Sequence, residues 1–249
     1  MRVIKVGGNR LDEPEFLEQL AGVAAELPGP MILVHGGGQA VDEVQVLLGS
    51  EPERVQGMRR TGPKALRAAL MVLCGQLRAQ LVAALIRNGI RAIGLSGFDA
   101  GLIRVRKLEN PTVDLGFVGE VVRVETELLY GLLEAGLLPV VSPLSLGLDG
   151  QIYNVNADNV AGAIAEAMGA SELAFVSDVP GVHRSGRLVP RLEIGRTENL
   201  IANEEIRAGM VPKVRAGSDA LRGGVPQVRI VDLRGLASGG GTLLTAGGS

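Results

Sequence analysis

The chain contains few of the residues on which several functional classes depend. Its 249 residues include one cysteine, Cys74, two histidines, no tryptophan and only 2% aromatic residues. A single cysteine excludes an internal disulfide, and no cysteine and histidine residues have the spacing of a zinc site. The scarce aromatic rings and the formal net charge of −2 provide neither base-stacking surface nor basic surface for nucleic acid. We therefore expect no protein-ligated metal centre and no nucleic-acid partner.

The sequence also lacks a segment typical of secretion or of a membrane span. It opens on a strand pattern at Met1–Ile4, without a charged and then apolar leader. The longest apolar stretch, 131–148, is interrupted by Glu134, Pro139 and Pro143. With 46% hydrophobic and 21% charged residues, the composition is typical of a folded globular protein. We expect a cytoplasmic protein that does not interact with membranes.

Lysine is scarce as well, and its positions are informative. The only lysines are Lys5, Lys64, Lys107 and Lys213, and every other basic side chain in the chain apart from histidine is arginine. Lysine is a compact point charge, whereas arginine is a planar fork. Lys5 ends an apolar run before Val6-Gly7-Gly8, and Lys213 ends Gly209-Met210-Val211-Pro212-Lys213. These two positions indicate contacts with a phosphoryl group, while Lys64 and Lys107 are interpreted as surface residues.

Strand and helix patterns alternate along the chain, which predicts a mostly parallel α/β sheet covered by helices on both faces. The expected strands are 3–6, 31–34, 92–95, 139–141, 173–176 and 227–231, with hairpin strands between 102 and 124. A first helix begins near Glu13, and the spacing of Asp12 and Glu15 predicts a capping box for it. The glycine-rich stretch 238–242 is either a loose tail or a loop near the last strand.

A long helix is predicted over 63–88, with Pro63 at its start and Gly89 as its stop signal. Its stretch 68–74 is apolar nearly all round. This pattern predicts burial on two sides, against the sheet and against another subunit.

Glycine and polar clusters follow several of the predicted strands. They are Val6-Gly7-Gly8, His35-Gly36-Gly37-Gly38, Ser96-Gly97 and Ser177-Asp178. In an open α/β sheet, ligands bind beyond the carboxyl ends of the strands, where glycine backbone N–H groups and helix N-termini can hold phosphate. A tight turn that needs glycine only for its positive φ is the alternative. No GxxxxGK[ST] motif occurs and no GxGxxG follows the first strand, which disfavours P-loop and hydride-transfer enzymes.

The acceptor of a phosphoryl group could be a hydroxyl or a carboxylate. A hydroxyl needs a general base, whereas a carboxylate with a pKa near ~4.3 is already a nucleophile at neutral pH. His35 either holds the strand-to-turn connection by a hydrogen bond or acts as a base. The lack of an obvious base favours a carboxylate acceptor. Catalysis would then rest on positioning and on charge neutralisation by lysines, backbone N–H groups and Mg²⁺.

Two further constellations could bind a polar ligand. Asn154, Asn156 and Asp158 alternate, so in an extended chain they share one face. Asp158 could instead be a helix cap. Arg59 and Arg60 are either a clamp for a substrate carboxylate or an exposed pair.

Taken in register, these motifs resemble the amino acid kinase family over nearly the whole chain, and within it the kinases of N-acetyl-L-glutamate in arginine biosynthesis. The resemblance rests on Ile4-Lys5-Val6-Gly7-Gly8, His35-Gly36-Gly37-Gly38, Gly57-Met58-Arg59-Arg60-Thr61, Leu115 to Glu120, Tyr153 to Asp158, Ser177 to Gly181 and Gly209 to Lys213. It implies a single domain, 1–249, with the α/β fold of that family: a three-layer α/β/α sandwich with an open, mostly parallel sheet. Residues 1–170 would form the lobe for the acylated amino acid and for dimerisation, and 171–249 the nucleotide-binding lobe.

The resemblance also implies a role for each matching residue. The catalytic group would be Lys5 and Lys213, which stabilise the transferring phosphoryl group, and Asp158, which orients both lysines. The substrate would be bound by Gly37, Gly38, Arg59 at its α-carboxylate and Asn154 at its acetamido group. The nucleotide would be bound by Gly8, Asp178, Gly181, Gly209 and Met210. ATP and Mg²⁺ are the implied cofactors.

The resemblance further implies a homodimer formed through the long helix 63–88. The chain begins at its first strand, as in the dimeric, arginine-insensitive relatives, without the extra helix that links dimers into hexamers. Two other functions stay open: a kinase of carrier-protein-linked aminoadipate or glutamate in lysine biosynthesis, and a nucleotide or amino-acid sensor of the same fold that has lost catalysis.

Overall fold

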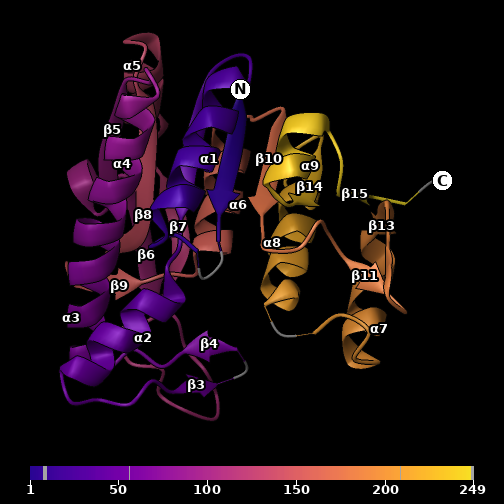
Figure 1. Cartoon of the computed structure of the whole chain (residues 1–249). Helices are drawn as coiled ribbons and strands as arrows, with labels where there is room; N and C mark the ends of the chain where they lie inside the picture. Colours follow the sequence, from indigo (N-terminus) through magenta and orange to yellow (C-terminus); the bar gives the residue numbers. More distant parts are fainter. Residues whose placement is uncertain (8–9, 56, 208, 248–249) are drawn as a thin grey trace.

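The computed structural model describes residues 1–7, 10–55, 57–207 and 209–247. In these residues one 11-stranded sheet runs in the order β13-β15-β14-β10-β1-β2-β8-β6-β7, and β5 and β9 also pair with β8 (Figure 1). The strands are β1 (Arg2–Val6), β2 (Met31–His35), β5 (Ala92–Gly97), β6 (Ile103–Lys107), β7 (Gly119–Val124), β8 (Leu138–Gly147), β9 (Ile152–Asn154), β10 (Glu172–Val176), β13 (Arg191–Glu193), β14 (Val228–Val231) and β15 (Thr242–Thr245). Most pairs are parallel, while β7 with β6, β9 with β8, and β15 with β14 are antiparallel.

Helices cover both faces of this sheet. They are α1 (Pro14–Glu26), α2 (Gly38–Leu47), α3 (Pro63–Met71), α4 (Arg78–Arg87), α5 (Thr126–Glu134), α6 (Ala157–Ala167), α7 (Thr197–Ala202), α8 (Met210–Arg222) and α9 (Leu233–Ser238). Two small hairpins lie outside the sheet: β3 (Arg54–Val55) with β4 (Met58–Arg59), and β11 (His183–Arg184) with β12 (Arg187–Leu188).

Two cores sandwich the sheet, because alternate residues of a strand point to opposite faces. On β1, Val3 packs into a core shared with α6 and α8, whereas Ile4 packs into a second core shared with α1, α3 and α4. The predicted three-layer α/β/α sandwich with a mostly parallel sheet is therefore confirmed.

The predicted long helix is one run, Pro63–Arg87, in which the π-helical turn Val72–Leu77 joins α3 to α4. Among the described residues it is the helix that passes, by length and composition, a test for a membrane span, with 39% of its most apolar window buried in the fold. Core helices pass the same test, and Ala68, Val72 and Leu81 of this helix are core residues. Its opposite side exposes Met71 and Ile86, at 52% and 56%.

Two local predictions are wrong. The first helix has no capping box: Glu13 is the N-cap residue, it makes no side-chain cap, and Pro14 opens the helix with a favourable fixed φ. The strand at 228–231 is not the last one, because residues 242–245 form β15, which lies between β14 and β13. The glycine-rich stretch before β15 is thus a connection between paired strands.

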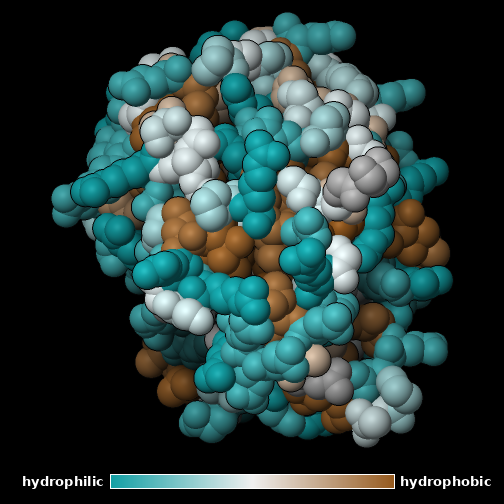
Figure 2. Space-filling model, turned by 90° about the vertical axis from the view of Figure 1, so that its right-hand side faces the viewer, coloured by the Kyte–Doolittle hydropathy of each residue, from teal (hydrophilic) through white to brown (hydrophobic). Residues whose placement is uncertain are grey.

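The carboxyl ends of β1 and β10 point to the edge of the molecule where α2 and the β3–β4 hairpin lie, at the bottom of Figure 1. The long helix forms the opposite side from β13 and β15 in that view. The side that carries the C-terminal elements is mainly hydrophilic, with small hydrophobic patches (Figure 2).

Candidate active site

Lys5 is held in the middle of the sheet. It pairs with Val34 of β2 on one side and with Phe175 of β10 on the other, and it is only 5% exposed. Strand alternation directs its side chain to the α6 face, where Nζ lies 2.8 Å from Asp158 Oδ1. A buried ammonium is costly without a counter-charge, so this ion pair accounts for a charged lysine at the end of a core strand.

Asp158 is not the cap of α6. That position belongs to Asn156, whose Oδ1 accepts a 2.7 Å hydrogen bond from the Asp158 backbone N–H. The Asp158 carboxylate is therefore available to other groups, and its Oδ2 lies 3.7 Å from Lys213 Nζ. One carboxylate thus stands between two ammonium groups.

Lys213 reaches this point from the first turn of α8. Its Nζ also donates to the Gly209 carbonyl, at 3.3 Å. Burial lowers the pKa of Lys213, and the charge of Lys5 lowers it further, while Asp158 and Asp178 act in the opposite direction. The two lysines therefore lie close enough to repel each other in the absence of an additional anion.

The glycines of the strand ends make room for these groups. A Cβ at Gly7 would lie 2.6 Å from Lys5 Nζ. Gly37 has a φ of 146°, and a Cβ there would lie 2.2 Å from Leu77 Cδ1. Only glycine fits the turn into α2 at this position.

Arg59 enters the site from the hairpin. Its guanidinium pairs with Asp42 and donates to Gln45 Oε1 at 3.2 Å and to the Gly38 carbonyl at 2.8 Å. Asn154, at the end of β9, donates to Thr61 Oγ1 at 3.2 Å.

One cavity of about 260 Å³ brings most of the predicted groups together. Its lining includes Lys5, Gly37, Gly38, Arg59, Asn154, Asn156 and Asp158. Lys213 adjoins it through Asp158. Gly8, predicted to bind the nucleotide, lies outside the described residues.

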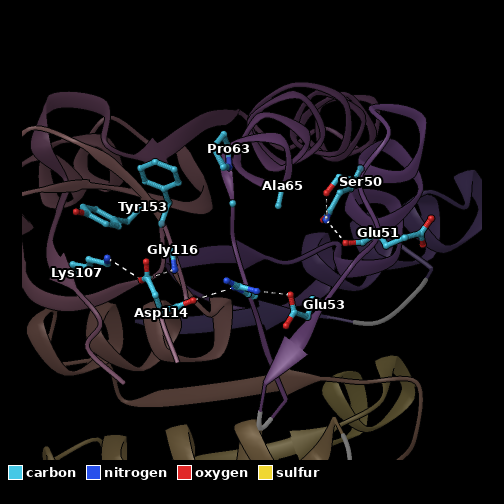
Figure 3. A pocket seen from close by; sticks show the side chains of 13 residues that line it. Ser50, Glu51, Glu53, Pro63, Ala65, Lys107, Asp114, Gly116 and Tyr153 are labelled. Atoms are coloured by element: carbon cyan, nitrogen blue, oxygen red, sulfur yellow. Dashed lines mark hydrogen bonds and ion pairs between the residues drawn. The ribbon is translucent and has the colours of Figure 1, made fainter. Parts of the chain in front are cut away.

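The predicted arginine pair is split. Arg60 pairs with Glu53 at 2.9 Å and donates to the Asp114 carbonyl at 3.1 Å. These residues line a different cavity of about 440 Å³, together with Lys107 and Tyr153 (Figure 3). Of the two arginines, only Arg59 shares a cavity with Lys5.

The described residues predicted to bind the nucleotide lie after β10, the strand next to β1, and at the start of α8. Asp178 is exposed just after β10, Gly209 is the N-cap residue of α8, and Met210 is the first residue of that helix. Gly181, with φ of 155°, approaches Thr242 so closely that a Cβ would lie 2.5 Å from Thr242 Oγ1. None of the four lines the cavity around Lys5. Gly209 and Met210 lie at the start of the helix that carries Lys213, where backbone N–H groups are free, and the charge of Asp178 acts on Lys213.

His35 takes the hydrogen-bonding role that the sequence left open. It is fully buried, and its Nδ1 lies 3.0 Å from the Gly36 carbonyl oxygen. Burial lowers the pKa of His35 to about 4. The ring is therefore neutral at pH 7.

Sequence reasoning missed the residues that hold the predicted binding groups. Asp42 and Gln45 hold Arg59, and Thr61 holds Asn154. A signal existed for two of them: Gly38, Asp42 and Gln45 are spaced i, i+4 and i+7, so they share one face of a helix.

Comparison with known proteins identifies the family of the chain. The model of the amino acid kinase family matches residues 1–232. The chain belongs to the amino acid kinase family. It is 49% identical over 245 residues to the acetylglutamate kinase of Roseiflexus castenholzii, covering 98% of this chain and 94% of that protein. It is 50% identical over 243 residues to the acetylglutamate kinase of Roseiflexus sp. (strain RS-1), covering 98% of this chain and 93% of that protein.

Among solved structures, smu.665 from Streptococcus mutans UA159 superposes with a TM-score of 0.86 at 26% identity, covering 99% of this chain and 98% of that one. The family predicted from the motifs is confirmed.

Proposed function

We propose that the protein is a kinase that transfers the γ-phosphoryl group of ATP to the side-chain carboxylate of N-acetyl-L-glutamate, in arginine biosynthesis. The products are N-acetylglutamyl 5-phosphate and ADP. The observation that carries this proposal is the Asp158 carboxylate between the ammonium groups of Lys5 and Lys213, beside a cavity lined by Arg59 and Asn154. Relatives 49% and 50% identical over nearly the whole chain are acetylglutamate kinases.

The chemistry needs little more than position and positive charge. A carboxylate oxygen of the substrate forms a bond to the γ-phosphorus, and the bond from that phosphorus to the β,γ-bridging oxygen breaks with its electron pair leaving on ADP. No proton is removed from the acceptor, so no general base is required. Lys5 and Lys213 would neutralise the charge on the transferring group, and Asp158 would keep both lysines in place.

The remaining assignments are those that the resemblance of the motifs implies. Arg59 would bind the α-carboxylate and Asn154 the acetamido group, with Gly37 and Gly38 donating backbone N–H groups. Gly8, Asp178, Gly181, Gly209 and Met210 would bind ATP, so that 171–249 serves the nucleotide and 1–170 the acyl substrate. A substitution at a residue assigned to the acyl substrate should raise the KM for that substrate alone. A substitution at a residue assigned to ATP should raise the KM for ATP alone.

Mg²⁺ would arrive with ATP. The described residues include no group of three or more histidine, cysteine, aspartate or glutamate side chains that could hold a metal ion. Magnesium in kinases is often held by one or two carboxylates and the substrate phosphates, and the exposed carboxylate of Asp178 suits that arrangement. When bound, the ion would neutralise charge on the phosphates.

We also propose that the protein acts in the cytoplasm as a homodimer through the helix Pro63–Arg87, which exposes Met71 and Ile86 on the side away from the sheet. Sedimentation equilibrium tests the dimer, and a monomer at micromolar concentration would contradict it.

The decisive experiment is acyl phosphate formation, trapped as the hydroxamate, with MgATP and either N-acetyl-L-glutamate or unacetylated glutamate. Turnover of the acetylated substrate alone is the expected result. Protein that binds MgATP and phosphorylates neither compound would contradict the proposal, and it would favour a carrier-linked acyl substrate or a sensor.

A further inference from the structure

Arg59 is held by a stripe of acceptors along one face of α2. The Gly38 carbonyl, the Asp42 carboxylate and the Gln45 side-chain oxygen follow one another at i, i+4 and i+7, and all three accept from Arg59. Gln45 is itself fixed, because its Nε2 donates to the Glu51 carbonyl at 2.9 Å. Gln45 is 2% exposed, so this acceptor has little freedom to move.

The three acceptors on α2 leave some of the N–H donors of the Arg59 guanidinium free to bind a ligand. Arginine has five N–H donors. Nη1 donates to Asp42 and Gln45, and Nη2 donates to Gly38. In the described residues Nε has no acceptor, so the Nε–H and the second N–H of Nη2 are left. Nε and Nη2 share one edge of the planar group, and this edge has the spacing that the two oxygens of a carboxylate need.

We propose that Asp42 and Gln45 are positioning residues that turn this free edge of Arg59 to the α-carboxylate of the acyl substrate. The inference rests on the proposed function, and it adds two residues that do not touch the substrate. A guanidinium anchored through Nη1 loses less rotamer entropy on binding, because its orientation is already set. The side chain of Arg59 is only 10% exposed, which strengthens its bond to Asp42 relative to a surface pair.

Asp42 also binds the other arginine of the hairpin. Its Oδ2 lies 2.6 Å from Arg54 Nη2, and Arg54 is 47% exposed. A purely structural role for Asp42 would be to fasten the β3–β4 hairpin to α2. Loss of Arg54 would remove that fastening and leave the orientation of Arg59 intact.

The test compares two substrates in Asp42→Asn. N-acetyl-L-glutamate has both carboxylates, whereas its α-amide keeps the accepting side-chain carboxylate and lacks the group that Arg59 would bind. Asp42→Asn should lower kcat/KM for the acid about tenfold, the usual order for one charge-assisted hydrogen bond, and change that for the α-amide by less than about twofold. The KM for MgATP should stay unchanged.

The second variant is Gln45→Met, which removes the weaker acceptor. It should give a smaller loss of kcat/KM with the same selectivity for the acid, and it replaces Asp42→Asn in the test if that variant does not fold.

Two matched controls accompany these variants. Glu43→Gln makes the same change of charge on the exposed side of α2, where Glu43 accepts only from Gln39 among the described residues, and it should behave as the wild type. Arg54 also lines the cavity, so Arg54→Ala should lower kcat/KM for acid and amide alike, without the selectivity of Asp42→Asn.

Equal losses on acid and amide, or an Arg54→Ala variant as selective as Asp42→Asn, would overturn the proposal. If the wild type phosphorylates neither compound, the proposed function fails. The same variants then decide this inference by calorimetric binding of acid and amide, where selective loss of affinity for the acid supports it and equal loss refutes it.

Discussion

Two buried clusters with the same charges lie at opposite ends of strand β1. At the carboxyl end, Asp158 stands between Lys5 and Lys213. At the amino end, Glu172 stands between Arg2 and Arg229. Each cluster has one carboxylate and two cations, and Arg2 and Lys5 are only three positions apart on the strand. The difference between them lies in the type of cation.

The arginine cluster is closed. Glu172 Oε1 accepts from Arg229, with Nε at 2.7 Å, and Oε2 accepts from Arg2 Nε at 2.8 Å. Arg229 also donates to the Gly240 carbonyl at 3.3 Å. These bonds join the amino ends of neighbouring strands β1, β10 and β14.

The lysine cluster is open. Lys213 is 3.7 Å from its carboxylate partner, and the pKa of Lys213 is lowered chiefly by burial. The cluster has one more positive than negative charge, and its residues Lys5 and Asp158 line a cavity. The arginines around Glu172 use both carboxylate oxygens in short hydrogen bonds, and this cluster stabilises the fold. The lysines around Asp158 are bound less completely, so their positive charge stays available for an anion.

The largest expected effect is on activity, from Lys213→Ala. This variant should lower kcat by about 10²- to 10³-fold, the range for removing one group that stabilises transition-state charge, with a small change in the KM values. Steady-state kinetics of hydroxamate formation measures it, and thermal unfolding should show a folded protein. Lys64→Ala is the matched control, since among the described residues the Lys64 ammonium donates only to the Gly49 carbonyl. A loss of MgATP affinity with kcat unchanged would place Lys213 in a binding site and favour the sensor.

The next effect is on stability, from Glu172→Gln. Removing one partner of a buried ion pair leaves its partners uncompensated, so the free energy of unfolding should fall by about 3 kcal/mol. Urea denaturation measures this, and kcat of the folded variant should be unchanged. As a control, Glu198→Gln disrupts the exposed pair with Arg215 and should cost less than about 1 kcal/mol. A Glu172 variant that is fully stable but inactive would reverse the comparison between the two clusters.

The smallest effect concerns His35, near the lysine cluster. Its pKa is about 4 in the folded protein, below the ordinary 6.5, so the unfolded chain binds more protons between these values. The contribution of neutral His35 to stability is therefore fully present above pH 6.5 and is lost as the pH falls toward 4. The loss attributable to His35 is about 2 kcal/mol between pH 7 and pH 5.

Urea unfolding at both pH values measures this, with His35→Asn as the reference that lacks the titrating group. An equal dependence on pH in the two proteins would show that His35 is not held neutral by burial.

The sequence predicted the fold, because the signals were local, and the structure brings most of the groups predicted to bind the acyl substrate into one cavity. Strand and helix periods, Pro63 and the strand-end glycines each act within a few residues. The alternation of side chains on β1 likewise placed Lys5 on the face opposite to Ile4. The domain division and the roles of the site residues remain predictions.

The rest depended on contacts between distant segments. Residues 242–245 are a strand because β14 on one side and Arg191–Glu193 on the other satisfy their backbone, which no local pattern indicates. Adjacent Arg59 and Arg60 face different cavities because successive side chains of extended chain point to opposite sides, and only packing decides which side meets α2. The sequence by itself determined the fold and the supply of lysines, glycines and carboxylates. The tertiary structure alone decided which carboxylate holds which cation, since the energy of an ion pair depends on a distance and a burial that the order of residues does not contain.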